Sequence, residues 1–378
     1  MRIVLDAVAT PPSGAGLTRI VELAIAAQDR PGYEYVVVAR PDVAQIVAAK
    51  APLIQLITPP RWFASGPQRI LWEQILLPRA LKEHAPDLVF SPFNVLPFYG
   101  WNSDPAFAVM VSNLAPYSRE MRSLCPKRRL PREIVLKKLT DASMAAAGLV
   151  LLQSKHAEQL IGDRVLRGKG LVIRHGRLMS SDVSKESLTS EREPTYFLIV
   201  AELHTHKGVD VAIRAFSRLA GNGSCRLVIC GAARDRRYTR KLKRLSKSLG
   251  VDQSVDFVGD QPHEEVIRLM SSAKACIACS VFENLSRIPG EAMAAGTPVI
   301  ASDIPGYRES CGEAALYFAP GDEVALAKCM HAVLQEAGLS DDLVSAGVKR
   351  LASTGSTQAA QDPQVLDALE RLVVEHRA

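Results

Sequence analysis

Two glutamates that lie eight positions apart are the residues of this sequence best suited to chemistry. Between Glu283 and Glu291 stand Ser286, a frequent helix N-cap, and Pro289, which a first helical turn tolerates. Gly296 would end that helix. Glu283 would then precede the helix, and Glu291 would lie about one turn inside it. Free N–H groups between the two carboxylates could bind a phosphate-sized anion, and the carboxylates could accept protons from sugar hydroxyls.

The residues around these glutamates resemble a known family signature. Glu283-Asn284 and the run Glu291–Ser302, E-A-M-A-A-G-T-P-V-I-A-S, are similar to the E-x7-E motif of retaining GT-B glycosyltransferases of family four. Pro289-Gly290 departs from the motif, because the family usually has a bulky apolar residue before the second glutamate. An ordinary loop and helix with two solvated glutamates is the alternative. It leaves unexplained why polar residues cluster at the end of an expected strand.

The resemblance implies an enzyme with a definite division of roles. It would move a hexose-type sugar from a nucleotide sugar to a glycan, lipid-linked or small-molecule acceptor and retain the anomeric configuration. Glu283 would hold hydroxyls of the transferred sugar, Glu291 the ribose, and Lys207 the diphosphate. The catalytic residues would be Glu283, Lys207 and Asn113. The further donor-binding residues that it implies are Gly14, Ala15, Gly16, His175, Asn284, Leu285, Ser286 and Arg287.

A glycine-rich turn follows the first expected strand and opens a helix. Its sequence from Pro11 to Gly16 is P-P-S-G-A-G. Glycines in such a turn let the backbone approach a phosphate. The turn is not the G-x-G-x-x-G dinucleotide fingerprint. It matches the place where the family has a glycine loop over the donor phosphates, and a tight strand-to-helix turn is the alternative.

The positive charge expected around the diphosphate is reduced in this sequence. Relatives grip the diphosphate with an arginine and a lysine, and Lys207 matches the lysine. Its ammonium group would neutralise the leaving group. Glu202 and His206 stand at positions where relatives have arginine. A protonated His206, Arg287 or Arg174 could compensate.

Two further positions differ from the family pattern. Many relatives have His-Asp where this chain has Ser112-Asn113. Asn113 can hydrogen-bond a sugar or a phosphate, but it cannot act as a base at neutral pH. The family's retaining transfer is thought to need no protein base, because the leaving diphosphate can take the acceptor's proton. Arg174 replaces the usual proline before His175, which could contact the donor or order the turn between domains.

The sequence gives little support for a metal site. Cys276 and Cys279 fall in an apolar strand, where positions three apart point to opposite faces, so we expect buried thiols. His204 and His206 have no further ligand at metal-site spacing. We therefore expect neither a metal nor a cofactor, with the nucleotide sugar acting as a substrate.

Composition is that of an ordinary soluble protein. The chain has 378 residues, of which 47% are hydrophobic and 23% charged, and no apolar run nears the roughly 20 residues that span a bilayer. Seven scattered cysteines favour a reducing cytoplasm. The net charge is +6, with basic residues concentrated between Arg119 and Arg177. That region could contact the inner face of a membrane or an anionic acceptor, or be a solvated face; no motif indicates nucleic acid.

Alternating strand and helix patterns position these residues and predict an α/β protein with parallel sheets. The expected strands are 2–8, 33–40, 53–58, 87–91, 106–112, 149–153, 171–174, 196–203, 226–230, 254–258, 275–280, 298–302 and 315–318. The expected helices are 18–27 and 70–84, the clearest of the first half, and 209–220, 238–249, 263–271, 323–336 and 364–374.

The resemblance turns this pattern into a GT-B fold, two Rossmann-like domains facing a central cleft. We expect an acceptor-side domain over residues 1–176, a linker over 177–194, a nucleotide-sugar domain over 195–355, and a last helix within 356–378 that returns to the first domain.

Two other functions stay open. A nucleotide-sugar-binding partner protein without turnover is favoured by the departures from the family pattern and opposed by the intact Glu283, Lys207 and Glu291. A sugar-nucleotide epimerase of similar architecture would lack the E-A-M-A-x-G-x-P run. No motif identifies the base and sugar of the donor, the acceptor or the oligomeric state.

Overall fold

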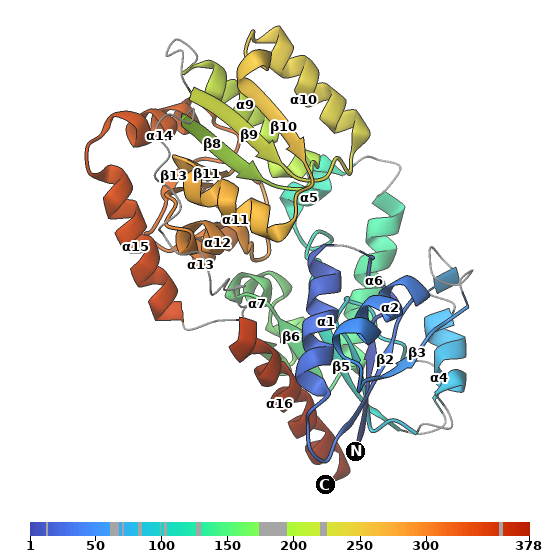
Figure 1. Cartoon of the computed structure of the whole chain (residues 1–378). Helices are drawn as coiled ribbons and strands as arrows, with labels where there is room; N and C mark the ends of the chain where they lie inside the picture. Colours follow the sequence, from blue (N-terminus) through green and yellow to red (C-terminus); the bar gives the residue numbers. More distant parts are fainter. Residues whose placement is uncertain are drawn as a thin grey trace. The chain divides into compact units, whose positions relative to one another are not determined.

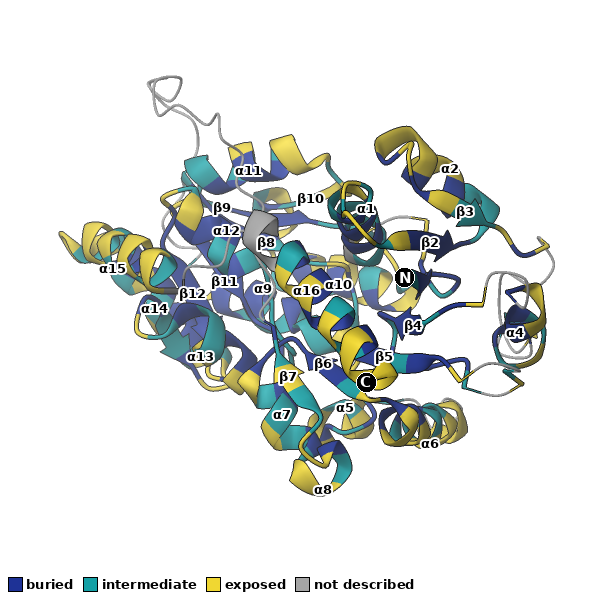
Figure 2. Cartoon of the chain, turned by 90° about the horizontal axis from the view of Figure 1, so that it is seen from below, coloured by how far each residue is buried: buried dark blue, intermediate teal, exposed yellow. Residues whose placement is uncertain are grey.

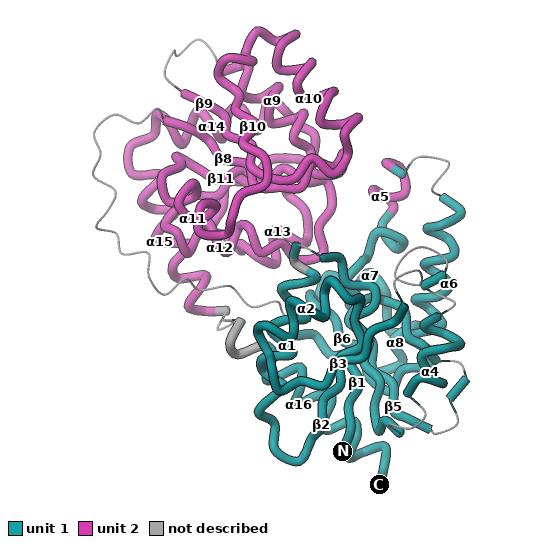
Figure 3. The backbone as a smooth tube through the Cα atoms, turned by 45° about the vertical axis from the view of Figure 1, so that its right-hand side comes forward, with its two compact units in different colours: residues 1–118, 125–174, 359–378 teal, residues 119–124, 175–358 magenta. Residues whose placement is uncertain are grey.

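The computed structural model describes residues 1–12, 14–60, 68–69, 72–81, 85–98, 100–101, 104–125, 130–173, 195–219, 225–354 and 358–378. The predicted linker 177–194, and with it Arg174 and His175, lies outside them. The chain divides into two compact units (Figure 3). Unit 1 comprises residues 1–118, 125–174 and 359–378, and unit 2 comprises 119–124 and 175–358.

Unit 1 is built on one parallel sheet (Figure 1). Its strand order is β3-β2-β1-β4-β5-β6-β7. Continuous runs of apolar residues form these strands because helices cover both faces of a parallel sheet. The order reverses between β1 and β4, which makes a topological switch point there. The strands are β1 (Arg2–Asp6), β2 (Glu34–Val38), β3 (Gln55–Ile57), β4 (Leu88–Ser91), β5 (Ala106–Val111), β6 (Leu149–Leu152) and β7 (Gly170–Val172).

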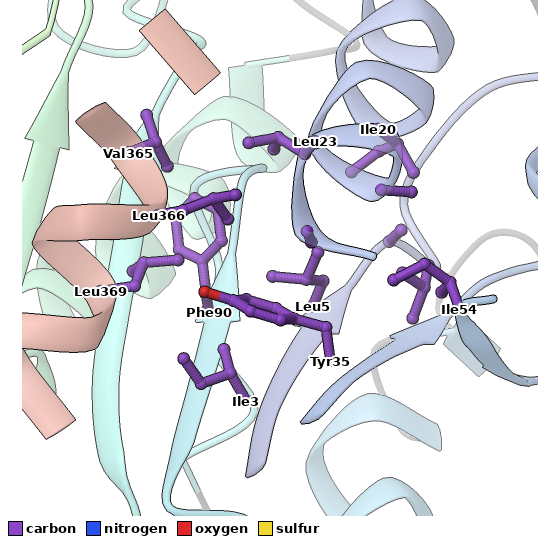
Figure 4. Packing of buried hydrophobic residues seen from close by; sticks show 14 of the residues in the cluster. Ile3, Leu5, Ile20, Leu23, Tyr35, Ile54, Phe90, Val365, Leu366 and Leu369 are labelled. Carbon is purple, nitrogen blue, oxygen red and sulfur yellow. The ribbon is translucent and has the colours of Figure 1, made fainter. Parts of the chain in front are cut away.

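The last helix of the chain is part of the core of unit 1. Helix α16 (Gln358–Arg377) contributes Val365, Leu366 and Leu369 to a buried cluster that also holds Leu23 of α1 (Ala15–Ala27) and Phe90 of β4 (Figure 4). Buried apolar surface of this kind contributes about 25 cal/mol per Å². The chain end is thus held to the first strands by packing.

One expected helix of unit 1 differs in the structure. The described part of 70–84 is a π-helix, η2 (Trp72–Leu76), followed by the short helix α4 (Leu77–Ala80). Pro78 has no N–H to donate to the carbonyl of Gln74, so a regular α-helix cannot continue through it. The other helices of unit 1 are α2 (Pro41–Lys50), α6 (Leu130–Ala146), α7 (Lys155–Ile161) and α8 (Asp163–Leu166).

Unit 2 repeats the same architecture with six parallel strands in the order β10-β9-β8-β11-β12-β13. Alternate residues of its central strand face two cores: Phe197 and Ile199 enter one cluster, and Tyr196 and Leu198 the other. The switch point lies between β8 and β11. The strands are β8 (Thr195–Val200), β9 (Cys225–Cys230), β10 (Val255–Gly259), β11 (Ala275–Ala278), β12 (Val299–Ser302) and β13 (Leu316–Phe318).

Helices surround the sheet of unit 2. Figure 2 shows most strands in dark blue and the outward faces of helices in yellow, as expected for a layered α/β protein. The helices are α5 (Arg119–Leu124), η6 (Thr205–Lys207), α9 (Val209–Ser217), α10 (Arg236–Ser248), η7 (Asp252–Ser254), α11 (His263–Ser272), α12 (Ile288–Ala294), α13 (Pro305–Cys311), α14 (Glu323–Gln335) and α15 (Leu339–Thr354).

The predicted α/β class with parallel sheets is confirmed, and every expected strand is present. Helix α10 begins earlier than predicted because the side chain of Asp235 accepts hydrogen bonds from the N–H groups of Arg237 and Tyr238. In the part of the chain that the structure describes, no helix is both long and apolar enough to cross a membrane.

Candidate functional site

An ion pair marks the switch point of the sheet in unit 2. The chain leaves β8 and reaches η6, which ends in Lys207; it leaves β11 and reaches a loop that carries Glu283. The Lys207 Nζ atom donates a hydrogen bond of 2.6 Å to Glu283 Oε1. The two side chains keep 21% and 15% of their surface exposed, so a ligand can reach both charges. In open α/β sheets, ligands bind at such a position.

A glycine allows the two loops to approach. Gly208 has a φ of +65°, and a Cβ atom on it would lie 2.1 Å from the carbonyl oxygen of Cys279. Both the backbone conformation and the close contact therefore require glycine. The N–H of Val281 also donates to the carbonyl of His206, at 2.9 Å. These backbone contacts fix the distance between the loop of Lys207 and the loop of Glu283.

Hydroxyl groups orient the carboxylate of Glu283. Ser280 Oγ donates to Glu283 Oε1 at 2.7 Å, and the hydroxyl of Tyr307 on α13 donates to Ser280 Oγ at 2.9 Å. Burial, followed by the carboxylate of Glu283, raises the pKa of Tyr307 well above its ordinary value, so its hydroxyl stays a donor. Lys207 and Ser280 both bind the Oε1 atom of Glu283. The other carboxylate oxygen, Oε2, can therefore accept hydrogen bonds from ligand hydroxyls.

A pocket adjoins this pair. Gly306 packs against the backbone of Glu283 so closely that a Cβ atom on it would lie 2.5 Å from the Glu283 carbonyl oxygen. Tyr307, the next residue of α13, lines the pocket. The pocket is lined by Ile199, Val200, Ala201, Lys207, Ile277, Ala278, Cys279, Ser280, Glu283, Ser286, Ile288 and Tyr307.

Glu291 is a buried carboxylate with an unused oxygen. It is 3% exposed, and its Oε1 atom has no hydrogen-bond partner among the described residues. Arg287 Nε lies 3.9 Å from that oxygen, which is too far for a hydrogen bond. A buried carboxylate oxygen without a donor costs free energy. A ligand hydroxyl that donated to it would remove that cost.

The helix that carries Glu291 starts later than predicted. Helix α12 begins at Ile288 with Arg287 as its N-cap, so the expectation that Ser286 caps it was wrong. Pro289 in the first turn presets the helical φ, and no side chain caps the helix. The Ser286 carbonyl accepts a bond from Ser310 Oγ instead, at 3.3 Å. Asn284, Leu285 and Ser286 thus form the loop between Glu283 and α12.

His206 carries no positive charge at pH 7 in the chain without a ligand. Burial, and next to it the charge of Lys207, lowers its pKa to about 4, so the imidazole is neutral at pH 7. Compensation for the absent arginine by a protonated His206 stays a prediction for the donor-bound state, because a diphosphate beside the imidazole would raise its pKa. Its ring stacks on His204, with centroids 5.7 Å apart. Glu202, the other residue that stands where relatives have arginine, accepts a hydrogen bond of 3.1 Å from Arg234 Nε.

The remaining predicted site residues that the structure describes lie in unit 1. Gly14, with a φ of +85°, precedes α1, and its carbonyl accepts from the N–H groups of Leu17 and Thr18. Ala15 and Gly16 are the first residues of that helix. The exposed Asn113 follows β5, and its side chain accepts from the N–H of Ala115 at 3.0 Å. His175 lies outside the described residues.

Sequence reasoning missed Ser280 and Tyr307, which orient Glu283. Tyr307 lies on a different helix, and no local signal links it to the glutamate. The cysteines behave as expected: Cys276 and Cys279 are buried in separate clusters on the two faces of the sheet. Burial raises the pKa of each thiol to about 12. Among the described residues, no group of three His, Cys, Asp or Glu side chains could hold a metal ion.

Part of the chain matches a described protein family. Residues 180–350 match the family "Glycosyl transferases group 1". The chain is 32% identical over 144 residues to the O-antigen chain mannosyltransferase RfbU of Salmonella typhimurium strain LT2, which covers 38% of this chain and 40% of that protein. The chain spans less than half the length of the curated relatives that it matches first.

Solved structures match nearly the whole chain. Sucrose-phosphate synthase from Thermosynechococcus elongatus has a TM-score of 0.78 at 19% identity and covers 99% of this chain and 100% of its own. Anabaena Alr3699/HepE in complex with UDP-glucose has a TM-score of 0.73 at 16% identity, over 98% of this chain and 100% of its own. At such low sequence identities, the structural similarity shows the fold alone. Residues 180–350 are therefore similar to group 1 glycosyl transferases, in a chain that has the GT-B fold.

Proposed function

We propose that the protein is a retaining glycosyltransferase that takes a hexose-type sugar from a nucleotide sugar. The observation that carries this proposal is the ion pair of Lys207 and Glu283 at the switch point of unit 2. Lys207 offers a cation to a diphosphate, and Glu283 offers a carboxylate to sugar hydroxyls. The similarity of residues 180–350 to group 1 glycosyl transferases favours a nucleotide-sugar donor, and Anabaena Alr3699/HepE was crystallised with UDP-glucose.

The pair would separate when the donor binds. The diphosphate would take the ammonium of Lys207, and the hydroxyls of the transferred sugar would donate to Glu283. As the bond to the anomeric carbon breaks, negative charge grows on the diphosphate and positive charge grows on the sugar ring. Lys207 and Glu283 oppose these charges, so both contacts strengthen in the transition state. Glu291, with its unused buried oxygen, would accept a hydrogen bond from the ribose.

The proton of the acceptor has a route that needs no protein base. Asn113 is neutral and cannot accept that proton. The leaving diphosphate oxygen can take it on the face where the acceptor attacks, which also retains the anomeric configuration. Gly14, Ala15 and Gly16 would approach the phosphates, and Asn113 would hydrogen-bond a sugar or phosphate oxygen. The acceptor would be a glycan, a lipid-linked sugar or a small molecule.

A panel of nucleotide sugars tests this function. We expect one of them to raise the melting temperature and to be consumed with release of its nucleoside diphosphate. NMR of the product should show the anomeric configuration of the donor. A donor that binds without being consumed would favour a partner protein that only binds nucleotide sugars. The neutral imidazole of His206 in the ligand-free chain is consistent with that alternative. An isomerised nucleotide sugar would identify an epimerase.

The reaction should need no metal or other cofactor. Lys207 can carry the diphosphate charge that a divalent cation carries in other enzymes. Transfer is therefore expected to continue at an unchanged rate in EDTA. Loss of activity in EDTA that magnesium or manganese restores would contradict this part of the proposal.

A cytoplasmic enzyme with a lipid-linked acceptor would need to reach the membrane surface, and helix α6 has suitable residues. Ile134 and Val135 are exposed by 51% and 53%, and the basic Arg132 and Lys138 lie on the same helix. Such a face complements anionic lipids. We expect co-sedimentation with anionic but not with neutral vesicles, and its loss in the Ile134→Glu variant. Equal sedimentation of both proteins would contradict a role of α6.

A further inference from the structure

A buried asparagine, Asn94, links segments of unit 1 that follow the carboxyl ends of the parallel strands. Asn94 lies three residues after β4, beside the switch point, and is 3% exposed. Its φ of +63° is in the left-handed region, which residues other than glycine adopt rarely and asparagine more readily than most. Its N–H donates to the carbonyl of Met110 in β5, at 3.0 Å. A tolerated backbone strain at a buried polar residue indicates that its side chain has a specific task.

The side-chain amide of Asn94 binds the backbone directly after β5. Its Oδ1 atom accepts from the N–H groups of Ser112, at 3.0 Å, and Asn113, at 2.8 Å. Its Nδ2 atom donates to the carbonyl of Asn113, at 2.9 Å. This arrangement fixes the orientation of the amide, because a flipped amide would set donors against donors. Asn94 therefore holds both backbone polar groups of Asn113.

Neighbouring contacts extend this anchor on both sides. Ser112 Oγ donates to the carbonyl of Pro92 at 3.0 Å and accepts from Gln153 Nε2, after β6, at 3.2 Å. On the other side, Phe93 packs against the start of α1, where a Cβ atom on Gly16 would lie 3.3 Å from Phe93 Cε1. The segment from Pro92 to Asn94 thus connects Gly16 with Asn113.

We propose that Asn94 is a positioning residue: its side-chain amide sets the place of Asn113 relative to the glycine turn at the start of α1. This inference rests on the proposed function, in which Asn113 and the glycine turn contact the reacting sugar and the phosphates. Asn94 itself touches neither ligand. Small displacements of catalytic groups reduce reaction rates strongly. We therefore expect the loss of the Asn94 amide to lower turnover more than donor affinity.

The Asn94→Asp variant tests the amide with almost no change in shape. Its carboxylate can still accept from the two N–H groups, but it places a second acceptor against the carbonyl of Asn113. Once protonated, the carboxylic acid has the donor and acceptor pattern of the amide again. We expect turnover about tenfold or more below that of the original protein at pH 8 and a ratio that recovers as the pH falls toward 6. The affinity for the nucleoside diphosphate should stay within about twofold.

Leu96→Ala serves as the matched control for stability. Leu96 is fully buried two residues further along the same segment, and its side chain is apolar. The variant should lower the melting temperature without a pH-dependent recovery of turnover. Asn94→Asp would overturn the inference if its turnover were unchanged, or if it fell only as far as in Leu96→Ala with no recovery at low pH.

Amide hydrogen exchange separates this inference from the proposed function. In Asn94→Ala, the N–H groups of Ser112 and Asn113 should lose protection, whereas Leu96→Ala should leave them protected. Unchanged protection in Asn94→Ala would overturn the anchor, whatever the enzyme does. An original protein that neither binds nor consumes any nucleotide sugar would overturn the proposed function and the catalytic purpose of the anchor, while lost protection would still support the anchor itself.

Discussion

The two sheets have the same strand order around their switch points, but different side chains gather there. In unit 2, the ends of β8 and β11 bring together Lys207 and Glu283, two charged groups that solvent can reach. In unit 1, β1 ends in Asp6, which is 2% exposed, and the segment after β4 carries the buried amide of Asn94. The topology decides where a ligand can bind, and the side chains decide which ligand fits.

This contrast assigns different tasks to the two units. A reachable cation and carboxylate in unit 2 suit a ligand that has both a diphosphate and sugar hydroxyls. The buried amide of Asn94 in unit 1 already makes its hydrogen bonds within the protein, so it suits a rigid support for groups on the surface. Substitutions in unit 2 should therefore change chemistry and donor affinity. Substitutions of buried polar groups in unit 1 should change stability or positioning.

The largest effect is expected at Glu283. Glu283→Ala removes hydrogen bonds that tighten as the sugar ring gains positive charge, so turnover should fall by about 10²-fold or more. The affinity for the free nucleoside diphosphate should stay nearly unchanged, because that ligand has no transferred sugar. Glu283→Gln is the matched control, since it keeps the shape and one acceptor oxygen. Turnover near normal in Glu283→Ala would remove Glu283 from the sugar site.

Lys207 should act on the diphosphate rather than on the transferred sugar. In Lys207→Ala the diphosphate loses its cation when its negative charge grows, so turnover should fall by about tenfold or more and exceed the loss in donor affinity. Lys207→Arg, which keeps the charge, should recover part of the rate. Steady-state kinetics beside calorimetry separates the two losses. A rate within about twofold of the original would mean that another cation holds the diphosphate.

Glu291 should affect binding more than rate. Glu291→Gln replaces a charged acceptor of the ribose with a neutral one, which corresponds to roughly 1.5–3 kcal/mol, or about 10- to 150-fold in affinity. Calorimetry with the free nucleoside diphosphate measures it, and a nucleotide with a 2′,3′-dideoxyribose is the matched ligand control. Equal affinities of both proteins for the normal ligand would exclude contact between Glu291 and the ribose.

The sequence was sufficient to predict the fold class and the loop position of Glu283 before a helix, for identifiable reasons. Parallel strands are continuous apolar runs, and the run after Glu291 has a long match to a family signature. The π-helix at 72–76 was not predicted, because the pattern before Pro78 is that of an ordinary helix. The neutral state of His206 depends on burial by distant segments. The contacts of Tyr307 and Asn94 join residues far apart in sequence, which no local pattern reveals.

The buried carboxylates of unit 1 give the smallest predicted effect and the sharpest contrast with unit 2. Burial raises the pKa of Asp6. Burial, followed by the charge of Asp6, raises the pKa of Glu73, although the Oε1 atom of Glu73 lies 3.3 Å from Arg69 Nε. A carboxyl whose pKa is raised on folding binds its proton more tightly in the folded state. The contribution of these two carboxyls to stability is therefore highest below their unfolded pKa near 4 and is lost as the pH rises through their folded pKa values.

Glu73→Gln should flatten that decrease, because an amide cannot lose a proton. We expect the melting temperature of the original protein to fall by a few degrees more than that of the variant between pH 5 and pH 8. Glu264→Gln, at an exposed position of α11, is the matched control and should follow the original protein. Parallel curves for Glu73→Gln and the original protein would show that Glu73 is ionised in the fold, and the contrast between a charged unit 2 site and a proton-holding unit 1 site would then be wrong.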